Sequence, residues 1–413
     1  MRLIVATSWE DELLQGLAGL PVQAVFGKLQ RDLVGGGRPA STLPAVDWEG
    51  MARHVALAHR LGFRFLYLWN VVSLGDAEYD PSYVARMQDQ LRRLVDLGID
   101  GVVVGMPWMI PLVKEAFPHL EVSVSSMVHV LSPREAQQHE SMGADTIILH
   151  HAGNRDFRTL AEIRATVKCD LELILNNSCV FQCPYATCHH VSPAFHSREG
   201  SASVLEYELF WCAGRYAQDA GEIVRSRWIR PEDLAVYESY GFDRFKVVGR
   251  GRDTAWILRA ARAYAARAYH GDLTDIISMS QHAPLNLARS RAAEGGAHAA
   301  TWAAIAEELT PVRALGLDNT RVPADFLKFF TTHDCNILSC RTCGYCEGIA
   351  RRAALGVRAW DGDAAPQMPT AAMFADLVLP GAPRVSAAAP DGHATDHEAA
   401  GPLAAREAGG SGR

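Results

Sequence analysis

Residues 146–176 read TIILHHAGNRDFRTLAEIRATVKCDLELILN. The stretch begins with an apolar run at Thr146–His150, continues through an amphipathic segment at Phe157–Val167 and ends with a second apolar run at Leu171–Asn176. Two short apolar strands joined by a helix form a β–α–β unit, in which the strands lie parallel and are buried on both faces. The stretch therefore predicts an α/β fold built on a parallel sheet.

The same alternation continues in both directions over the first 270 residues. Amphipathic segments such as Trp48–Leu61 and Tyr83–Leu97 separate further apolar runs, as helices do between the strands of a parallel sheet. Eight strands in this order fit a closed (β/α)8 barrel of the TIM type, and an open doubly wound sheet is the alternative. The six further strands are expected at Leu3–Ala6, Val22–Phe26, Phe63–Trp69, Gly101–Gly105, Val122–Ser126 and Arg244–Gly249.

The domain organisation follows from where this alternation stops. Residues 177–230 contain four cysteines and no clear strand, which predicts a long functional insertion above one edge of a barrel that spans residues 1–270. Residues 271–360 are expected to form a helical or irregular C-terminal region with a second cysteine motif. Residues 361–413 are rich in Ala, Pro, Gly, Asp and His, and we expect a disordered tail there.

Composition limits the class of protein. The chain has 413 residues, 48% hydrophobic and 21% charged, and a net charge of −7, so it lacks the overall basic field that drives non-specific nucleic-acid binding. No apolar run reaches the roughly 18 residues of a membrane span, and the N-terminus does not read as a secretory signal. Nine cysteines, an odd number clustered in two places, argue against a secreted disulfide framework. We therefore expect a cytoplasmic protein.

One cysteine cluster lies near the C-terminal end of the predicted core. It runs from Cys335 to Cys346, and Cys340, Cys343 and Cys346 follow one another at intervals of three residues. This C-x2-C-x2-C spacing places thiolates on a tight loop and resembles that of bacterial-type iron–sulfur loops. Structural zinc sites also use C-x2-C pairs, so zinc is the alternative metal.

The other cysteine cluster follows the predicted strand that ends at Asn176. Because this strand end belongs to the barrel face that carries active sites, we expect a metal centre there. His189 and His190 could complete a mixed site or be ordinary surface residues, and Cys169 is expected to be a buried small hydrophobe. The cysteines of this cluster are Cys179, Cys183, Cys188 and Cys212, so the chain has enough thiols for one shared cluster or for two.

Polar residues at predicted strand ends are candidates for substrate binding. Ser125, Ser126, His150 and Asn177 fall at the expected barrel mouth, as do the neighbouring Asn70, His129, His151 and Asn176. Lys246 lies in the last strand, and Arg250 and Arg252 lie in a glycine-containing turn that leads into a helix N-terminus. Such a turn suits a carboxylate or phosphate, which predicts a small anionic substrate or co-substrate.

Several of these segments together resemble the peptidase U32 family over about residues 60–270 and, less closely, at the C-terminal cysteines. The resemblance implies a barrel with a cysteine-ligated 4Fe-4S cluster, to which Cys179, Cys183 and Cys212 would contribute. It also implies oxygen-independent hydroxylation of tRNA, ribosomal RNA or the ubiquinone ring, with prephenate as the oxygen source. The segments are Val124-Ser125-Ser126, Asn154-Arg155-Asp156-Phe157, Asn177-Ser178-Cys179-Val-Phe-Gln-Cys183-Pro184, Trp228-Ile229-Arg230-Pro231-Glu232-Asp233 and Phe245-Lys246-Val-Val-Gly249-Arg250.

The chain departs from the usual family pattern around its cysteines, adds the 335–346 cluster and lacks the large C-terminal extension of the RNA-modifying members. A small molecule is therefore the expected substrate, with RNA as the alternative. The first hypothesis is an iron–sulfur hydroxylase or oxidoreductase. The second is a peptidase, although the sequence contains neither H-E-x-x-H nor G-x-S-x-G. The third is a non-catalytic, cluster-bearing subunit of a heteromeric complex. As an assembly, a hetero- or homo-oligomer is expected.

Overall fold

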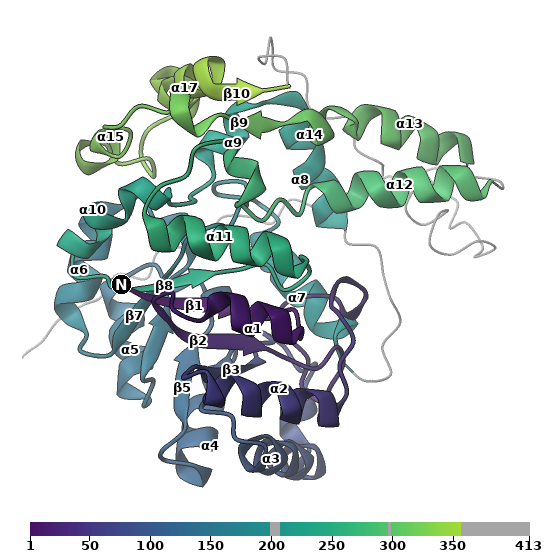
Figure 1. Ribbon diagram of the computed structural model, residues 1–413, viewed down its shortest axis with the longest axis vertical. Helices are drawn as coiled ribbons and strands as arrows, with labels where there is room; N and C mark the ends of the chain where they lie inside the picture. The colour runs from purple at the N-terminus through teal and green to yellow at the C-terminus, as the bar shows by residue number, and fades with distance from the viewer. Residues whose placement is uncertain (199–206, 296–298, 357–413) are drawn as a thin grey trace, which may run out of the picture. The chain divides into compact units, whose positions relative to one another are not determined.

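Eight parallel strands close into a barrel in the computed structural model, which describes residues 1–198, 207–295 and 299–356 (Figure 1). Each strand pairs with the next, and β8 pairs with β1 in the register Leu3 to Phe245, which closes the ring. The predicted (β/α)8 barrel is thereby confirmed and the open sheet excluded. The strands are β1 (Arg2–Ala6), β2 (Val22–Gly27), β3 (Arg64–Trp69), β4 (Gly101–Val104), β5 (Glu121–Val124), β6 (Thr146–Ile148), β7 (Asp170–Ile174) and β8 (Arg244–Val247).

Several strands end earlier than their apolar runs predict. The runs through Ser126, His150 and Asn176 each continue two residues beyond the observed strand. The extra residues belong to the loops at the carboxyl end of the barrel, where 3₁₀ turns η3 (Ser126–Val128) and η4 (His151–Gly153) begin almost at once. The polar ends of these runs therefore lie at the barrel mouth, which is where barrel enzymes bind substrates.

Helices surround the barrel on its outer side, and side-chain caps fix where several of them begin. Asp47, Asp80, Asp156 and Asp253 each accept a hydrogen bond from a backbone N–H of the first turn. Ser132 Oγ accepts from Glu135 N, and the Glu135 carboxylate accepts from Leu131 N. These two reciprocal hydrogen bonds fix the start of the helix that begins at Pro133. The helices are α1 (Asp11–Leu17), α2 (Trp48–Arg60), α3 (Pro81–Asp96), α4 (Met109–Ala116), α5 (Pro133–Ser141), α6 (Phe157–Thr166), α10 (Leu234–Ser239) and α11 (Thr254–Ala266).

The inside of the barrel is divided between an apolar cluster and an ionic network. The apolar cluster includes Ile4, Phe26, Leu68 and Ile174, which are at most 5% exposed. In the network, Arg244 donates to Glu121 at 2.7 Å and to Glu172 at 2.8 Å, and Lys246 Nζ lies 2.9 Å from Glu172. Every charge of this network therefore has a partner of opposite sign, as buried ions require.

The insertion after β7 is helical in its described part, with α7 (Ala186–His196), α8 (Tyr207–Gln218) and α9 (Gly221–Arg225). The C-terminal region contacts it, because α8 packs against α12, α13 and α14 and α9 packs against α17. Helices α12 and α13 run side by side away from the barrel (Figure 1). The elements of this region are α12 (His282–Glu294), α13 (Ala299–Leu309), α14 (Pro311–Ala314), β9 (Gly316–Leu317), α15 (Lys328–Thr332), α16 (Cys340–Cys343), α17 (Tyr345–Ala353) and β10 (Ala354–Leu355).

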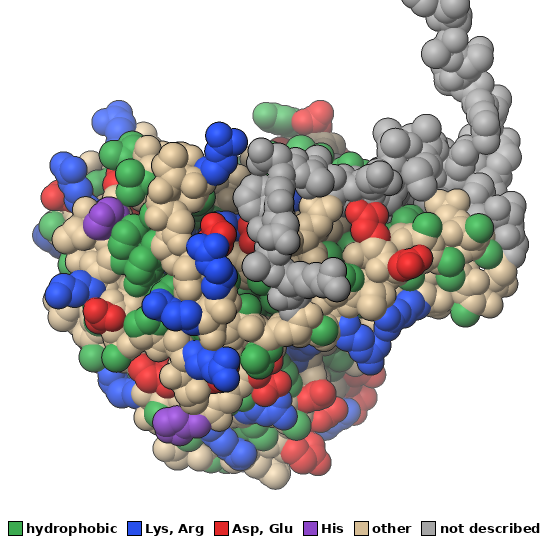
Figure 2. All heavy atoms as spheres, turned by 90° about the horizontal axis from the view of Figure 1, so that it is seen from above, with side chains coloured by type: hydrophobic (Ala, Val, Ile, Leu, Met, Phe, Trp, Pro, Cys, Tyr) green, Lys and Arg blue, Asp and Glu red, His purple; other side chains and the backbone are tan. Residues whose placement is uncertain are grey.

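The antiparallel pair of β9 and β10 was not predicted, because strands of two residues carry no periodicity. The expected tail at 361–413 lies outside the described residues. On the face in Figure 2, basic and acidic side chains are interspersed over the described surface. None of the described helices combines the length and the apolar character that crossing a bilayer requires.

Candidate functional site

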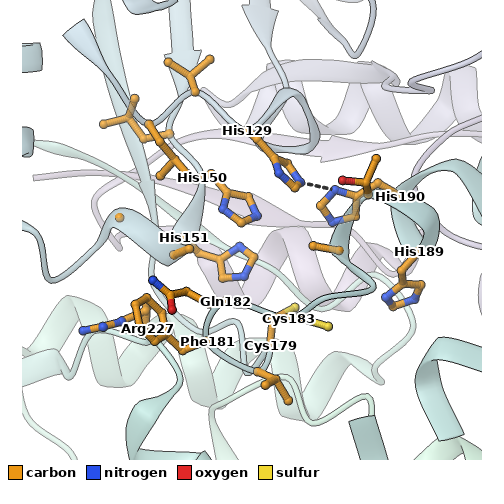
Figure 3. Close-up of a pocket in the computed structure, with 18 of the residues that line it drawn as sticks. His129, His150, His151, Cys179, Phe181, Gln182, Cys183, His189, His190 and Arg227 are labelled. Atoms are coloured by element: carbon orange, nitrogen blue, oxygen red, sulfur yellow. Dashed lines mark hydrogen bonds between the residues drawn. The ribbon is translucent and has the colours of Figure 1, made fainter. Parts of the chain in front are cut away.

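A cavity of about 540 Å³ opens beyond the carboxyl ends of β6 and β7. The loop after β5, the loop after β6, helix α7 and the segment that follows β7 supply its walls, and Leu160 and Ile163 of α6 add apolar surface. Histidines form one wall and cysteines the facing one (Figure 3). Its chemically reactive lining residues are His129, His150, His151, His189, His190, Cys179, Cys183, Cys212 and Arg227.

The histidines pack directly against one another. His129 Nε2 lies 2.6 Å from His190 Nδ1, so one ring donates a hydrogen bond to the other (Figure 3). The His150 ring stacks on that of His129 with centroids 4.1 Å apart and lies 4.2 Å from that of His151. His150 is 6% exposed, and neither of its ring nitrogens has a hydrogen-bond partner among the described residues.

Burial keeps these imidazoles neutral. Burial, followed by neighbouring positive charge, lowers the pKa of His151 and of His189 to about 4 and that of His190 to about 3. The pKa of His150 falls well below its ordinary value for the same reasons, burial first and then His151, His129 and His190. Neutral imidazole nitrogens can accept a proton or bind a metal ion, so the wall is basic in the chemical sense although it carries no charge.

The cysteine wall gathers three of the four predicted insertion cysteines. Cys179 and Cys183 follow β7, and Cys212 reaches the cavity from α8. Asn177 Nδ2 donates to Cys179 Sγ at 3.4 Å and Gln281 Nε2 donates to Cys212 Sγ at 3.3 Å. Burial raises the pKa of all three thiols, so each holds its proton until a metal displaces it.

These three thiols fit an iron–sulfur cluster or a zinc ion in donor chemistry, because both take buried cysteine sulfur with amide donors around it. The fourth insertion cysteine, Cys188, is exposed on α7 and does not line the cavity. Cys179, Cys183 and Cys212 together form the cavity cysteine group.

The second cysteine group comprises Cys335, Cys340, Cys343 and Cys346. Cys340 and Cys343 are exposed at the two ends of the short helix α16, whereas Cys346 is more buried in α17. Burial raises the pKa of Cys346 to about 11, against the opposing charges of Arg155, Arg227 and Arg225. The charge of Cys335 bears on the pKa of both Cys340 and Cys346, so these thiols are neighbours.

Arginines lie between the two cysteine groups. Arg155 is 2% exposed and lies over the rings of Trp228 and Phe326, each at 4.7 Å. Arg227 lies 3.7 Å over the ring of Phe181, lines the cavity, and also borders a small hollow next to Cys335. Buried guanidinium groups beside several thiols suit an anionic metal–thiolate centre, whose negative charge they would offset.

The predicted anion-binding residues are found in different settings. Lys246 is already paired with Glu172 inside the barrel. Arg250 has a buried Nη1 without a hydrogen-bond partner, and burial together with the charge of Arg38 lowers its pKa to about 9. Arg252 donates to Met279 O at 2.7 Å, and burial and Arg38 likewise lower its pKa. Arg38, Arg250 and Arg252 together concentrate positive charge in one region. A bound anion would offset this charge.

The remaining predicted substrate residues have structural contacts. Ser125 caps η3 and is 2% exposed, and Ser126 begins that turn. Asn177 donates from the same amide nitrogen toward His151 Nδ1 at 3.2 Å and toward Cys179. It thus connects the histidine wall to the cysteine wall.

Sequence reasoning missed Arg38 and the joining of His129, His150 and His190. Arg38 lies in the loop after β2, yet its charge bears on the pKa of Cys179, His189 and Arg250. Three glycines at 35–37 precede it, which marks an unusual loop but not a charge facing the mouth. The histidines were each noticed, but their convergence from three segments leaves no local pattern.

Comparison with known proteins adds a family to this geometry. Residues 42–270 match peptidase family U32. The uncharacterized protease MJ1657 of Methanocaldococcus jannaschii is 28% identical over 246 residues, which cover 60% of this chain and 73% of that protein. The solved structure of the U32 peptidase Mk0906 aligns with 59% of this chain and 90% of its own at 19% identity, with a TM-score of 0.46. Since the family match spans more than half of the 413 residues, the chain belongs to peptidase family U32.

Proposed function

We propose that this U32 protein is an iron–sulfur oxidoreductase that hydroxylates a small molecule without using molecular oxygen, taking the oxygen from a small anionic donor that is reduced as the substrate is oxidised. One observation carries the proposal: Cys179, Cys183 and Cys212 line a single cavity whose other wall is built of neutral imidazoles. A hydroxylation needs a redox centre and proton acceptors next to the substrate, and these two walls supply candidates for both.

The chain's own residues would prepare the cavity for this chemistry. Gln281 and Asn177 donate toward the sulfurs, which would favour thiolates once a cluster replaces their protons. A 4Fe-4S cluster held by Cys179, Cys183 and Cys212 would supply electron transfer next to the cavity. His151, whose pKa burial lowers to about 4, is a neutral imidazole at neutral pH and would hydrogen-bond to the bound substrate or oxygen donor.

The anionic character of the oxygen donor rests on three arginines near the cavity, Arg38, Arg250 and Arg252, which are not among the residues that line it. The charges of Asp32 and Asp253 act on Arg250 and Arg252, but Arg250 Nη1 has no hydrogen-bond partner among the described residues, and the charge of Arg38 also acts on Cys179 and His189 of the cavity. A compact molecule with carboxylates, such as the prephenate that the family resemblance implies, would satisfy them. RNA remains the second substrate class; the interspersed charges on the face in Figure 2 favour the small molecule.

Iron and sulfide analysis tests the proposal directly. Full-length protein purified without oxygen should be brown and contain iron and acid-labile sulfide, and it should consume prephenate in the presence of its hydroxyl acceptor. Cys179→Ala and Cys212→Ala should each lose the iron of the cavity cysteine group because a cluster needs every thiolate. Cys169→Ala is the matched control, because Cys169 lies outside both groups.

A colourless protein that holds zinc in place of iron would overturn the proposal. An iron-containing protein that is inert alone but active with a co-purified partner would instead identify a subunit of a larger complex.

Peptide hydrolysis is the second candidate, favoured by the family name and by the protease name of the relative. A hydroxyl does lie 2.7 Å from an imidazole in the pair Thr7 and His54, but these residues are 1% and 2% exposed and neither lines the cavity. Casein cleavage that persists in Cys179→Ala would favour hydrolysis over the iron–sulfur reaction.

A further inference from the structure

Three histidines on the cavity wall converge from three separate elements. His129 closes η3, His150 follows β6 and His190 lies in α7. One ring nitrogen from each lies within 4.8 Å of the others. Within the part of the chain that the structure describes, this is the one group of three histidine, cysteine or acidic side chains that meets so closely.

The backbone is specialised to bring His129 into the group. His129 adopts φ 62° and ψ 41°, the left-handed region that residues other than glycine seldom enter. Ser125, the first residue after β5, fixes the turn by accepting from Met127 N. This conformation turns the imidazole toward His190 (Figure 3).

The hydrogen bond between His129 and His190 holds a proton at the position that a bound cation would take. The proton between His129 Nε2 and His190 Nδ1 bridges two nitrogens 2.6 Å apart. His150, buried beside them, has no hydrogen-bond partner for either nitrogen among the described residues. An unsatisfied buried imidazole costs free energy, and a ligand that accepts its lone pair would recover it.

We propose that His129, His150 and His190 bind a divalent transition-metal ion, Zn²⁺ or Fe²⁺. Imidazole nitrogen is a preferred ligand of both ions. With metal–nitrogen bonds of about 2.0–2.1 Å in a tetrahedral site, ligand nitrogens lie roughly 3.3 Å apart, so the 2.6 Å pair needs only a small opening.

The ion would keep a charge of +2, because all three ligands are neutral, and at least one coordination position would remain for a ligand from the cavity. Water or an anionic oxygen of a substrate fits that position. The site is distinct from the cavity cysteine group, because no cysteine sulfur joins this set of ligand atoms within 4.8 Å among the described residues. The proposal does not depend on iron–sulfur binding by the cysteines.

Zinc binding to the full-length protein, with its iron content left intact, tests the proposal. After incubation with Zn²⁺ and desalting, we expect one zinc per chain by mass spectrometry of the metals. Zinc-edge X-ray absorption should show nitrogen or oxygen at about 2.0 Å and no sulfur at about 2.3 Å. His190→Ala should weaken zinc binding by more than roughly 100-fold, beyond the 10- to 100-fold lost with an outer-shell partner.

His189→Ala is the matched control, because it removes the neighbouring imidazole of the same helix, which lies outside the triple, and should leave zinc binding unchanged. His129→Asn is the second variant: asparagine tolerates the left-handed backbone, so the fold is kept while the ligand is lost. Equal zinc binding by wild type, His190→Ala and His129→Asn would overturn the proposal, as would a zinc site dominated by sulfur. Both outcomes are independent of whether iron is present.

Discussion

Single side chains near the barrel mouth have protonation equilibria far from those of free amino acids. His54 of α2 is an example outside the cavity: it is 2% exposed, and its Nε2 lies 2.7 Å from Thr7 Oγ1. Burial lowers its pKa to about 4, against the opposing effect of Asp11. Folding therefore depends on this imidazole remaining neutral.

This shift predicts a contribution to the pH dependence of stability. An unfolded histidine has a pKa of about 6.5, so the unfolded chain binds more protons than the folded one between about pH 6.5 and 4. Stability falls as the pH falls through this window, and below pH 4 both states are protonated. His54→Gln should reduce the slope of unfolding free energy against pH by up to about 1.36 kcal/mol per unit, measured by urea unfolding.

Histidines of the cavity add to the same slope in the wild type, so the difference between the two proteins is the informative quantity. The exposed His119→Gln serves as the matched control for loss of an imidazole. Identical slopes in wild type and His54→Gln would contradict the assignment.

At the scale of elements, β5, β7 and β8 are joined by ions inside the barrel. Burial alone would raise the pKa of Glu172, but Lys246 and Arg244 hold it below its ordinary value. Lys246 is therefore part of the ionic network inside the barrel. Of the predicted anion-binding residues, Arg250 and Arg252 remain as candidates to bind an anionic ligand.

Removing one member of this network should destabilise the protein strongly. Glu172→Ala leaves Arg244 and Lys246 buried without their shared carboxylate, and breaking a buried ion pair costs about 3–5 kcal/mol. Thermal and urea unfolding measure the loss. Glu49→Ala removes the partner of Arg53 in an exposed pair and should leave stability nearly unchanged. A similar effect of both substitutions would show that the network is not a source of stability.

The strands could be predicted because each is a short apolar run bounded by polar residues, as at Leu171–Asn176. The apolar runs are longer than the observed strands, because the polar residues at their ends belong to loops. The cavity cysteine group was partly predictable: Cys179 and Cys183 are close in sequence, whereas Cys212 joins them only through the packing of α8. The histidine triple was beyond prediction because 61 residues separate His129 from His190 and no spacing rule connects them.

At the scale of the whole molecule, Arg227 and its partner Phe181 border both the cavity with the first cysteine group and the small hollow next to Cys335 of the second. The cavity cysteine group belongs to the insertion after β7, and the second group to the region after α15. Each group has its own surroundings, amide donors for the first and arginines for the second. Because of these different surroundings, we expect two metal centres and not one shared centre.

The iron content of variants that each lack one cysteine shows how many metal centres the protein has. We expect Cys179→Ala and Cys343→Ala each to lose about half of the iron, because each removes a ligand of one centre only. Iron per chain and acid-labile sulfide are the measurements, with Cys169→Ala as the control for loss of an unrelated thiol. Complete loss of iron in either variant alone would mean one shared centre.

The ionic network inside the barrel also orders events during synthesis. Glu121 and Glu172 leave the ribosome long before Arg244, which lies 123 residues after the first of them. Until β8 arrives, Glu172 lacks both of its cationic partners, whereas Glu121 can already pair with Arg64 of β3. Closure therefore waits for the last strand, and a nascent chain that stalls before residue 244 presents unpaired strand edges to chaperones instead of a finished ring.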